Sequence, residues 1–178
     1  MPAYEDIQKA KLLIVAILRE SGGSFTGKTR LYKAFYVAHL YHYQKQTGVL
    51  SDYPVVRMPR GPAIDDGDNL LNSLVQEGLI HIGKRMNGPY VEEVYTLIGQ
   101  ASALADHEWA SVRDAVQWIA DKTATQLSEW THEYSNTWED TPNGRVMNIY
   151  ADLLDEAEYQ QMKQRHQQAK GIVDAVFG

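Results

Sequence analysis

This sequence of 178 residues contains no cysteine, no excess of basic over acidic residues and no long hydrophobic run. Because cysteine is absent, disulfides, thiolate zinc sites and thiol catalysis are excluded. The longest apolar run, residues 12–18, is far shorter than the roughly 20 residues that a transmembrane helix needs. Near the N-terminus stand Glu5 and Asp6, where a secretory signal would carry basic residues. We therefore expect a cytoplasmic protein that does not enter a membrane.

Acidic side chains outnumber basic ones. The 23 Asp and Glu residues against 17 Lys and Arg residues give a formal net charge of −6 and a pI near 5.5. Non-specific binding of nucleic acid depends on Lys and Arg side chains that replace counterions along the phosphates. Nucleic acid is therefore a possible partner but not a favoured one, and a small basic protein is better suited to the charge.

The spacing of apolar residues predicts a mostly α fold (α+β). Helical periodicity covers residues 5–20, 27–46 with Thr26 as the cap, 65–77, 103–122, 125–138 and 151–175. A β-branched stretch at 54–58 is broken by 59–62, and the runs 79–86 and 91–97 around Asn87-Gly88-Pro89 indicate a hairpin. The expected architecture is a helical domain with a small hairpin that resembles a wing, followed by C-terminal helices.

Residues 22–29, Gly-Gly-Ser-Phe-Thr-Gly-Lys-Thr, match the phosphate-loop pattern G-x-x-x-x-G-K-T. A working phosphate loop needs a strand directly before the first glycine and a later strand that ends in a magnesium-binding Asp. Residues 19–21 separate the apolar run from Gly22, and no later strand ends in such an Asp. A nucleotide-binding enzyme that uses Lys28 and Thr29 is therefore an unfavoured alternative to a plain glycine-rich link.

Other residue types with chemical potential have simpler interpretations. His39 and His42 lie three apart on one predicted helix, but the spacing marks no third metal ligand. Asp65, Asp66 and Asp68 stand at a predicted helix start, where acids complement the helix dipole. We predict no catalytic residues, no cofactor, no metal ligands and no enzymatic activity.

Aromatic and basic residues offer a contact surface. Tyrosines crowd the second predicted helix, and the tryptophans lie in the C-terminal half. Tyr and Trp are favoured in protein interfaces because one end is apolar and the other forms hydrogen bonds. The basic residues around this helix and the following strand form either a solvated face or a surface for protein or nucleic acid: Lys28, Arg30, Lys33, Arg57 and Arg60.

Three segments, in order, resemble the signatures of one family. Residues 29–38 are similar to a K-L-x-K-L-L-Y-x-A helix, and residues 56–63 to a strand with a G-P-V turn. Residues 127–133 with Trp138 resemble an L-S-x-x-[ST]-H segment followed by Trp. The family is the Panacea domain of SocA-like antitoxins and phage-associated proteins. Arg60 departs from its pattern where an aromatic is usual, and Ala63 where Val is common.

The resemblance implies an antitoxin domain over residues 1–156, with residues 157–178 as its C-terminal helical extension. It implies neutralisation of a cognate protein toxin, encoded by a neighbouring gene, through direct binding that covers the toxin's active surface. A protease or a chaperone is a possible further partner. A winged-helix-like nucleic-acid-binding regulator is the first alternative function. The expected partner-binding residues are Tyr32, Lys33, Tyr36, Arg57, Arg60, Gly61, Pro62, Trp130, His132 and Trp138.

Overall fold

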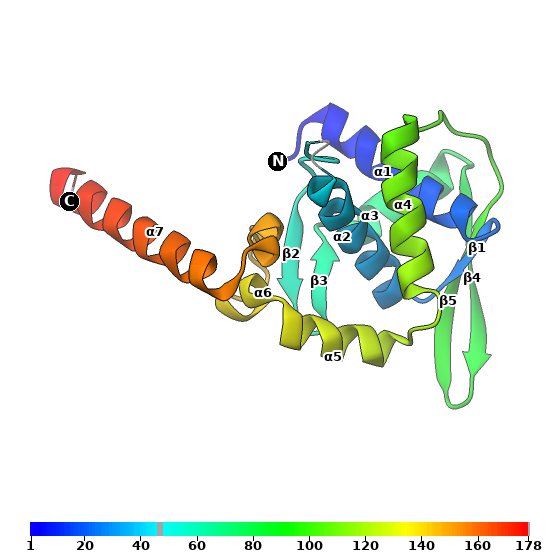
Figure 1. Cartoon of the computed structure of the whole chain (residues 1–178). Helices are drawn as coiled ribbons and strands as arrows, with labels where there is room; N and C mark the ends of the chain where they lie inside the picture. Colours follow the sequence, from blue (N-terminus) through cyan, green and yellow to red (C-terminus); the bar gives the residue numbers. More distant parts are fainter. Residues whose placement is uncertain (46–47, 178) are drawn as a thin grey trace.

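The computed structural model describes residues 1–45 and 48–177 (Figure 1). The helices are α1 (Tyr4–Glu20), α2 (Lys28–Gln44), α3 (Gly67–Gln76), α4 (Asp106–Ile119), α5 (Ala124–Tyr134), α6 (Asn136–Asp140) and α7 (Glu156–Phe177), with a 3-10 turn η1 (Ile149–Leu153). The strands are β1 (Ser24–Thr26), β2 (Val55–Met58), β3 (Gly61–Ile64), β4 (Ile80–Asn87) and β5 (Tyr90–Leu97). The predicted mostly α fold with a small β part is confirmed.

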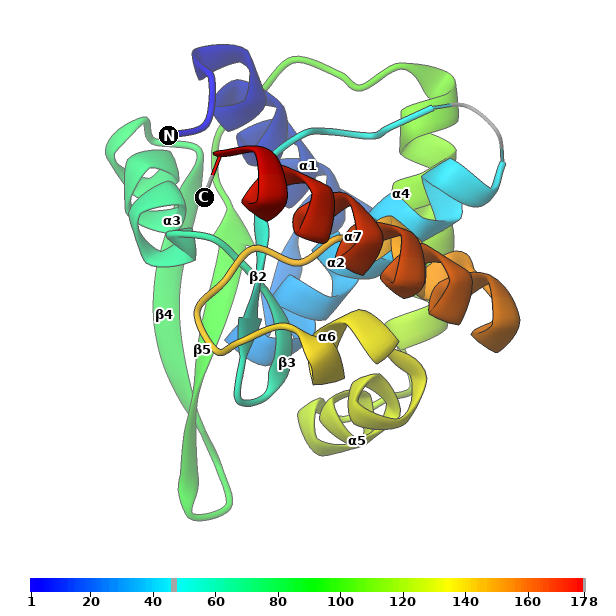
Figure 2. The same ribbon diagram turned by 90° about the vertical axis from the view of Figure 1, so that its left-hand side faces the viewer.

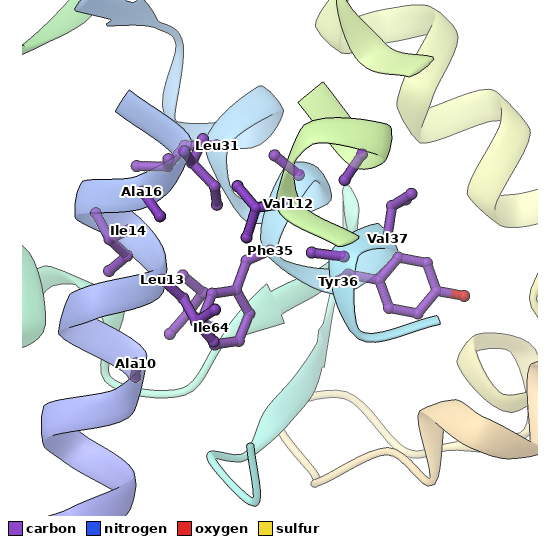
Figure 3. Close-up of a cluster of buried hydrophobic side chains, with 14 of the residues drawn as sticks. Ala10, Leu13, Ile14, Ala16, Leu31, Phe35, Tyr36, Val37, Ile64 and Val112 are labelled. Carbon is purple, nitrogen blue, oxygen red and sulfur yellow. The ribbon is translucent and has the colours of Figure 1, made fainter. Parts of the chain in front are cut away.

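The core lies between α1, α2 and α4, with α2 at the centre. Figure 3 shows Leu13 of α1 facing Phe35 of α2 beside Ile64 of β3, with Val112 of α4 above them and Ile14 on α1. All of these side chains are at most 3% exposed. Since α2 has neighbours on several sides, most of its residues are buried, which accounts for its dense run of apolar and aromatic residues.

Two details of α2 differ from the sequence prediction. The predicted cap Thr26 belongs to β1, and Gly27 takes the N-cap position with a φ of 91°. A side chain rarely adopts this φ, which favours glycine over a Thr cap here. The predicted helix end at residue 46 lies outside the described residues.

The β residues form two antiparallel sheets. The predicted hairpin is confirmed as β4 and β5, and the unpredicted strand β1 pairs with β5 to complete a sheet of order β1-β5-β4. The hairpin extends away from the helices (Figures 1 and 2). The predicted stretch at 54–58 contains β2, but Gly61 and Pro62, which belong to the break expected at 59–62, begin its partner strand β3.

The phosphate-loop hypothesis is wrong. Residues 12–18, which would have to form the preceding strand, lie within helix α1. Backbone amides of the loop are already used, since Gly23 donates to the Leu18 carbonyl at 2.8 Å and Gly27 to the Glu93 carbonyl at 2.9 Å. Lys28 pairs with Asp68 at 2.7 Å instead of standing ready for a phosphate.

The C-terminal part is more divided than predicted. The single helix expected at 125–138 is broken at Ser135, whose hydroxyl caps α6 by accepting from the Trp138 amide. The last helix was expected to begin at residue 151, but residues 151–153 belong to η1, and α7 begins at Glu156 and extends away from the rest of the chain (Figure 1). Among residues 1–45 and 48–177, no helix has the length and hydrophobicity needed to span a membrane.

Candidate partner-binding site

The turn between β2 and β3 is the point where the three signature segments meet. Lys33 of α2 donates to the carbonyls of Arg60 at 2.8 Å and Pro62 at 3.1 Å. From α5, the Ser128 hydroxyl donates to the Arg60 carbonyl at 3.0 Å. From the end of the third segment, the Trp138 indole donates to the Met58 carbonyl at 2.8 Å. Side chains from elements far apart in sequence thus fix the backbone of one short turn.

Gly61 is needed in this turn for two reasons. Its φ of +108° belongs to a region that side chains rarely adopt. A Cβ atom at this position would also lie 2.6 Å from the Lys33 Nζ and 3.2 Å from the Thr131 Cγ2. The glycine of the G-P signature is therefore explained by conformation and by the close approach of Lys33.

Lys33 is buried under the turn, at 1% exposure. Desolvation lowers the pKa of its amine to about 7, because an ammonium group out of water is penalised. Its hydrogen-bond partners are the two backbone carbonyls, which stabilise the charged form less than a carboxylate would. The sequence interpretation of Lys33 as part of a solvated basic face is wrong.

Beside the turn, three side chains stack in layers at the surface. The rings of His132 and Trp138 lie parallel with centroids 3.9 Å apart, and the Arg57 guanidinium lies 4.4 Å from the centre of the Trp138 ring. The His132 Nε2 also donates to the Pro59 carbonyl at 3.2 Å. We call the surface formed by the turn and the two stacked rings the turn platform. It consists of Met58, Pro59, Arg60, His132 and Trp138.

Tyr36 lies on the other side of α2 from α1 and is fully buried (Figure 3). Its hydroxyl donates to the Asp152 carboxylate at 2.6 Å, and the same carboxylate accepts from the Ser135 hydroxyl at 2.6 Å and from both the amide and the hydroxyl of Thr137, at 3.0 and 2.8 Å. This network joins α2, the α5–α6 link and η1. No sequence pattern had marked Asp152, because its partners are separated from it by 15 to 116 positions.

Trp130 belongs to an aromatic cluster next to this network. Its ring lies 4.5 Å from that of Trp118 and stacks on Tyr134 at 4.7 Å, while Tyr36 lies 6.5 Å away. Trp130 is half-buried and Tyr134 is exposed. The cluster therefore reaches the surface through Tyr134, which the sequence prediction did not include.

A cavity of about 530 Å³ lies between the start of α2, the turn and the start of α3. Tyr32 is half-buried at its edge, and its hydroxyl lies so close to Gly67 that a Cβ there would be 2.3 Å away. Burial, together with nearby Asp68, raises the pKa of Tyr32 well above its usual range. A second hollow of about 1100 Å³ lies between the start of α2, the hairpin and the start of α5. Both hollows are lined by Lys28, Thr29 and Arg60.

The predicted partner-binding residues divide into two groups. Six are exposed or half-buried: Tyr32, Arg57, Arg60, Trp130, His132 and Trp138. Tyr36 is buried behind α2, and its burial argues against the prediction that it contacts a partner. Lys33, Gly61 and Pro62 are also buried, and they are open to contact only where they line the 530 Å³ cavity. Their burial follows from the hydrogen bonds that Lys33 makes to the turn.

The structure is that of a small α+β domain whose three signature segments converge on one rigid, partly exposed turn. Residues 31–139 match the family described as Antitoxin SocA-like, Panacea domain. The match covers more than half of the sequence, and the chain belongs to this family. No curated protein and no solved structure matches the chain.

Proposed function

We propose that this protein is the antitoxin of a toxin–antitoxin pair and that it neutralises its cognate toxin by direct binding. The observation that carries the proposal is membership of the SocA-like antitoxin family over residues 31–139. The toxin is a separate protein, and we expect its gene to be adjacent.

The turn platform suits this role physically. Its backbone is held by side-chain donors from α2, α5 and α6, so little conformational entropy is lost when a partner binds. Its exposed groups are an aromatic stack and a guanidinium, the residue types enriched at binding hot spots. The formal net charge of −6 favours encounter with a basic toxin. Inhibition would follow from covering the toxin's active surface, without chemistry by this protein.

The test is co-expression with the product of the neighbouring gene. We expect that product alone to arrest growth, and co-expression with this protein to restore growth and give a complex that co-elutes in size-exclusion chromatography. A harmless neighbour, or a toxic one that neither co-elutes nor is neutralised, would contradict the proposal.

A charge reversal locates the contact. Arg60 has an exposed side chain, and only its backbone carbonyl serves the turn, so Arg60→Glu should leave folding intact. Because the charge reversal replaces a repulsive guanidinium by an attractive carboxylate, we expect Arg60→Glu to strengthen the affinity for a basic toxin by about tenfold, about 1.4 kcal/mol. Arg165→Glu, an exposed arginine on α7, is the matched control and should change affinity less than twofold.

The nucleic-acid alternative gains no support from the hairpin. Its cationic side chains on β4, Lys84 and Arg85, lie opposite Glu93 and Glu92 on β5, and Arg85 pairs with Glu92 at 3.3 Å. Carboxylates so placed offset the attraction to phosphates.

A further inference from the structure

We propose that the toxin docks an extended, basic segment in a groove along the first turn of α2. We call this groove, which is made of the two hollows described above, the α2 groove. The identity of its occupant, a segment of the toxin, rests on the proposed function. The groove lies next to the turn platform, with which it shares Arg60.

The first argument is continuity. The two hollows, of about 530 and 1100 Å³, share Lys28, Thr29 and Arg60 in their linings, and we infer that they connect at these residues. The first is lined by the turn and the start of α3, and the second by the β4–β5 hairpin and the start of α5. A continuous path past several elements fits an extended chain better than a compact small molecule.

The second argument is charge. Carboxylates outnumber cations among the side chains that line the groove: Asp65, Asp66, Asp68, Glu92 and Glu93 against Lys28, Arg60, Lys84 and the buried Lys33. Lys28 and Asp68 offset each other at 2.7 Å, and Glu93 lies 3.6 Å from the same amine, while Asp65 and Asp66 stand on the side of the groove near the start of α3. This small excess of carboxylates favours Lys and Arg side chains over phosphate groups as the occupant.

The third argument is the mixed character of the groove. The part under the turn has apolar walls from Val56, Pro62, Ala63 and Ile64, with the Tyr32 phenol at the edge and the aspartates at the rim. An extended peptide binds with alternate side chains in pockets, and here an apolar side chain would enter the cavity while a basic neighbour faces the rim. We therefore infer a segment in which apolar and basic residues are adjacent.

Blocking the junction tests the proposal. Thr29 is half-buried and lines both hollows, so Thr29→Trp should fill their meeting point. We expect Thr29→Trp to weaken toxin affinity in isothermal titration calorimetry at least tenfold. Asn72→Trp, at an exposed position of α3 outside the groove, is the control and should change affinity less than twofold. If thermal melting shows that Thr29→Trp does not fold, Thr125→Trp, at an exposed position on the second hollow, takes its place.

Short probes identify the occupant. Fluorescein-labelled 12-residue peptides that tile the toxin are measured by fluorescence anisotropy, beside a labelled 12-nucleotide single-stranded RNA. We expect one basic peptide to bind wild-type protein, to bind at least tenfold more weakly to Thr29→Trp, and to weaken as salt rises. The double variant Asp66→Asn, Asp68→Asn should weaken this peptide at least threefold and reduce the salt dependence.

The outcomes separate the groove from the function. Wild-type neutralisation that Thr29→Trp leaves unchanged would overturn the groove and leave the antitoxin proposal standing. Failure of the wild type to bind or neutralise the toxin would overturn both. RNA that binds in the groove, with loss of binding in Thr29→Trp, would replace the peptide by nucleic acid as its occupant.

Discussion

The β2–β3 turn and helix α7 differ in what holds them in place. Side chains from α2, α5 and α6 donate to the turn's carbonyls, and Lys33 is buried beneath it. In α7, Tyr159 is the buried residue, and the exposed apolar residues Ile172, Val173, Val176 and Phe177 lie toward its end. The family match includes the turn and stops at residue 139, before α7 begins. Polar side chains hold both regions, but the turn is held from three helices, whereas Tyr159 and Lys163 of α7 bond to Asp140 from the first half of that helix.

The largest effect on stability is expected from a change that cuts the hydrogen-bond network around Asp152. Asp152→Ala would leave the buried donors of Tyr36, Ser135 and Thr137 without their acceptor, and should lower the free energy of unfolding by about 3–5 kcal/mol. Urea denaturation measures this. Asp152→Asn keeps part of the acceptor capacity and should lower the free energy of unfolding by about half as much. A loss below 1 kcal/mol for the alanine variant would show that the network does not hold the C-terminal elements.

The next effect concerns the turn itself. Gly61→Ala forces a side chain into a φ of +108° and against Lys33, so we expect a loss of about 3 kcal/mol in the free energy of unfolding. Gly144, which has a φ of 76° but open space around its Cβ position, is the matched control. Gly144→Ala should cost about 1 kcal/mol, from backbone strain alone. Equal losses at the two positions would contradict the role of the Lys33 contact.

A smaller effect depends on pH. His39 is buried, and since the Phe35 carbonyl can only accept, the Nδ1 carries the proton while the Nε2 accepts from Ser51 at 2.6 Å. Burial lowers the pKa of His39 from 6.5 to about 4. The stability that this neutral ring contributes is present above pH 6.5 and is lost as pH falls toward 4, because the unfolded chain takes up the proton first.

The measurement compares two pH values and two proteins. Between pH 7.5 and pH 5 we expect His39 to account for a fall of about 2 kcal/mol in the free energy of unfolding. Burial also lowers the pKa of His42, so the contribution of His39 is the difference between wild type and His39→Asn. A variant that shows the same pH dependence as the wild type would refute the assignment.

The smallest effect is expected in α7. Deletion of all residues after Lys163 keeps the buried Tyr159 and the Lys163–Asp140 pair at 2.9 Å. It removes residues that are exposed over the described part of this segment, so the free energy of unfolding should change by less than about 0.5 kcal/mol. Thermal melting checks this. A large loss would show that the end of α7 packs against something, and would remove the contrast with the turn.

The fold was predictable from sequence where local periodicity is strong. The core positions of α1 are an example, because a period of 3.6 in apolar residues directly reflects one buried face. The hairpin was indicated by two β-like runs on either side of the turn residues Asn87-Gly88-Pro89. The strands β1 and β3 were missed, because each is short and forms only when its partner is in place. The break at Ser135 was missed as well, since its hydroxyl serves both as a helix cap and as a donor to Asp152.

The candidate site was predictable in part. The signature segments indicated which parts of the chain matter, and the structure brings them together at one turn. Sequence could not show that Lys33 and Tyr36 face inward. A lysine is ordinarily solvated, and only the carbonyls of residues 60 and 62, brought over α2 by the β2–β3 hairpin, make its burial possible.

The amino-acid sequence by itself determined the α+β class, the helical periods, the exclusion of cysteine chemistry and the family. Each of these depends on residue identity or on spacing within one segment. The tertiary structure decided that the phosphate-loop pattern is a link, that Asp152 anchors Tyr36, and that Lys28, Thr29 and Arg60 line two neighbouring hollows. Such properties arise from contacts between distant segments, whose burial and mutual approach no local pattern encodes.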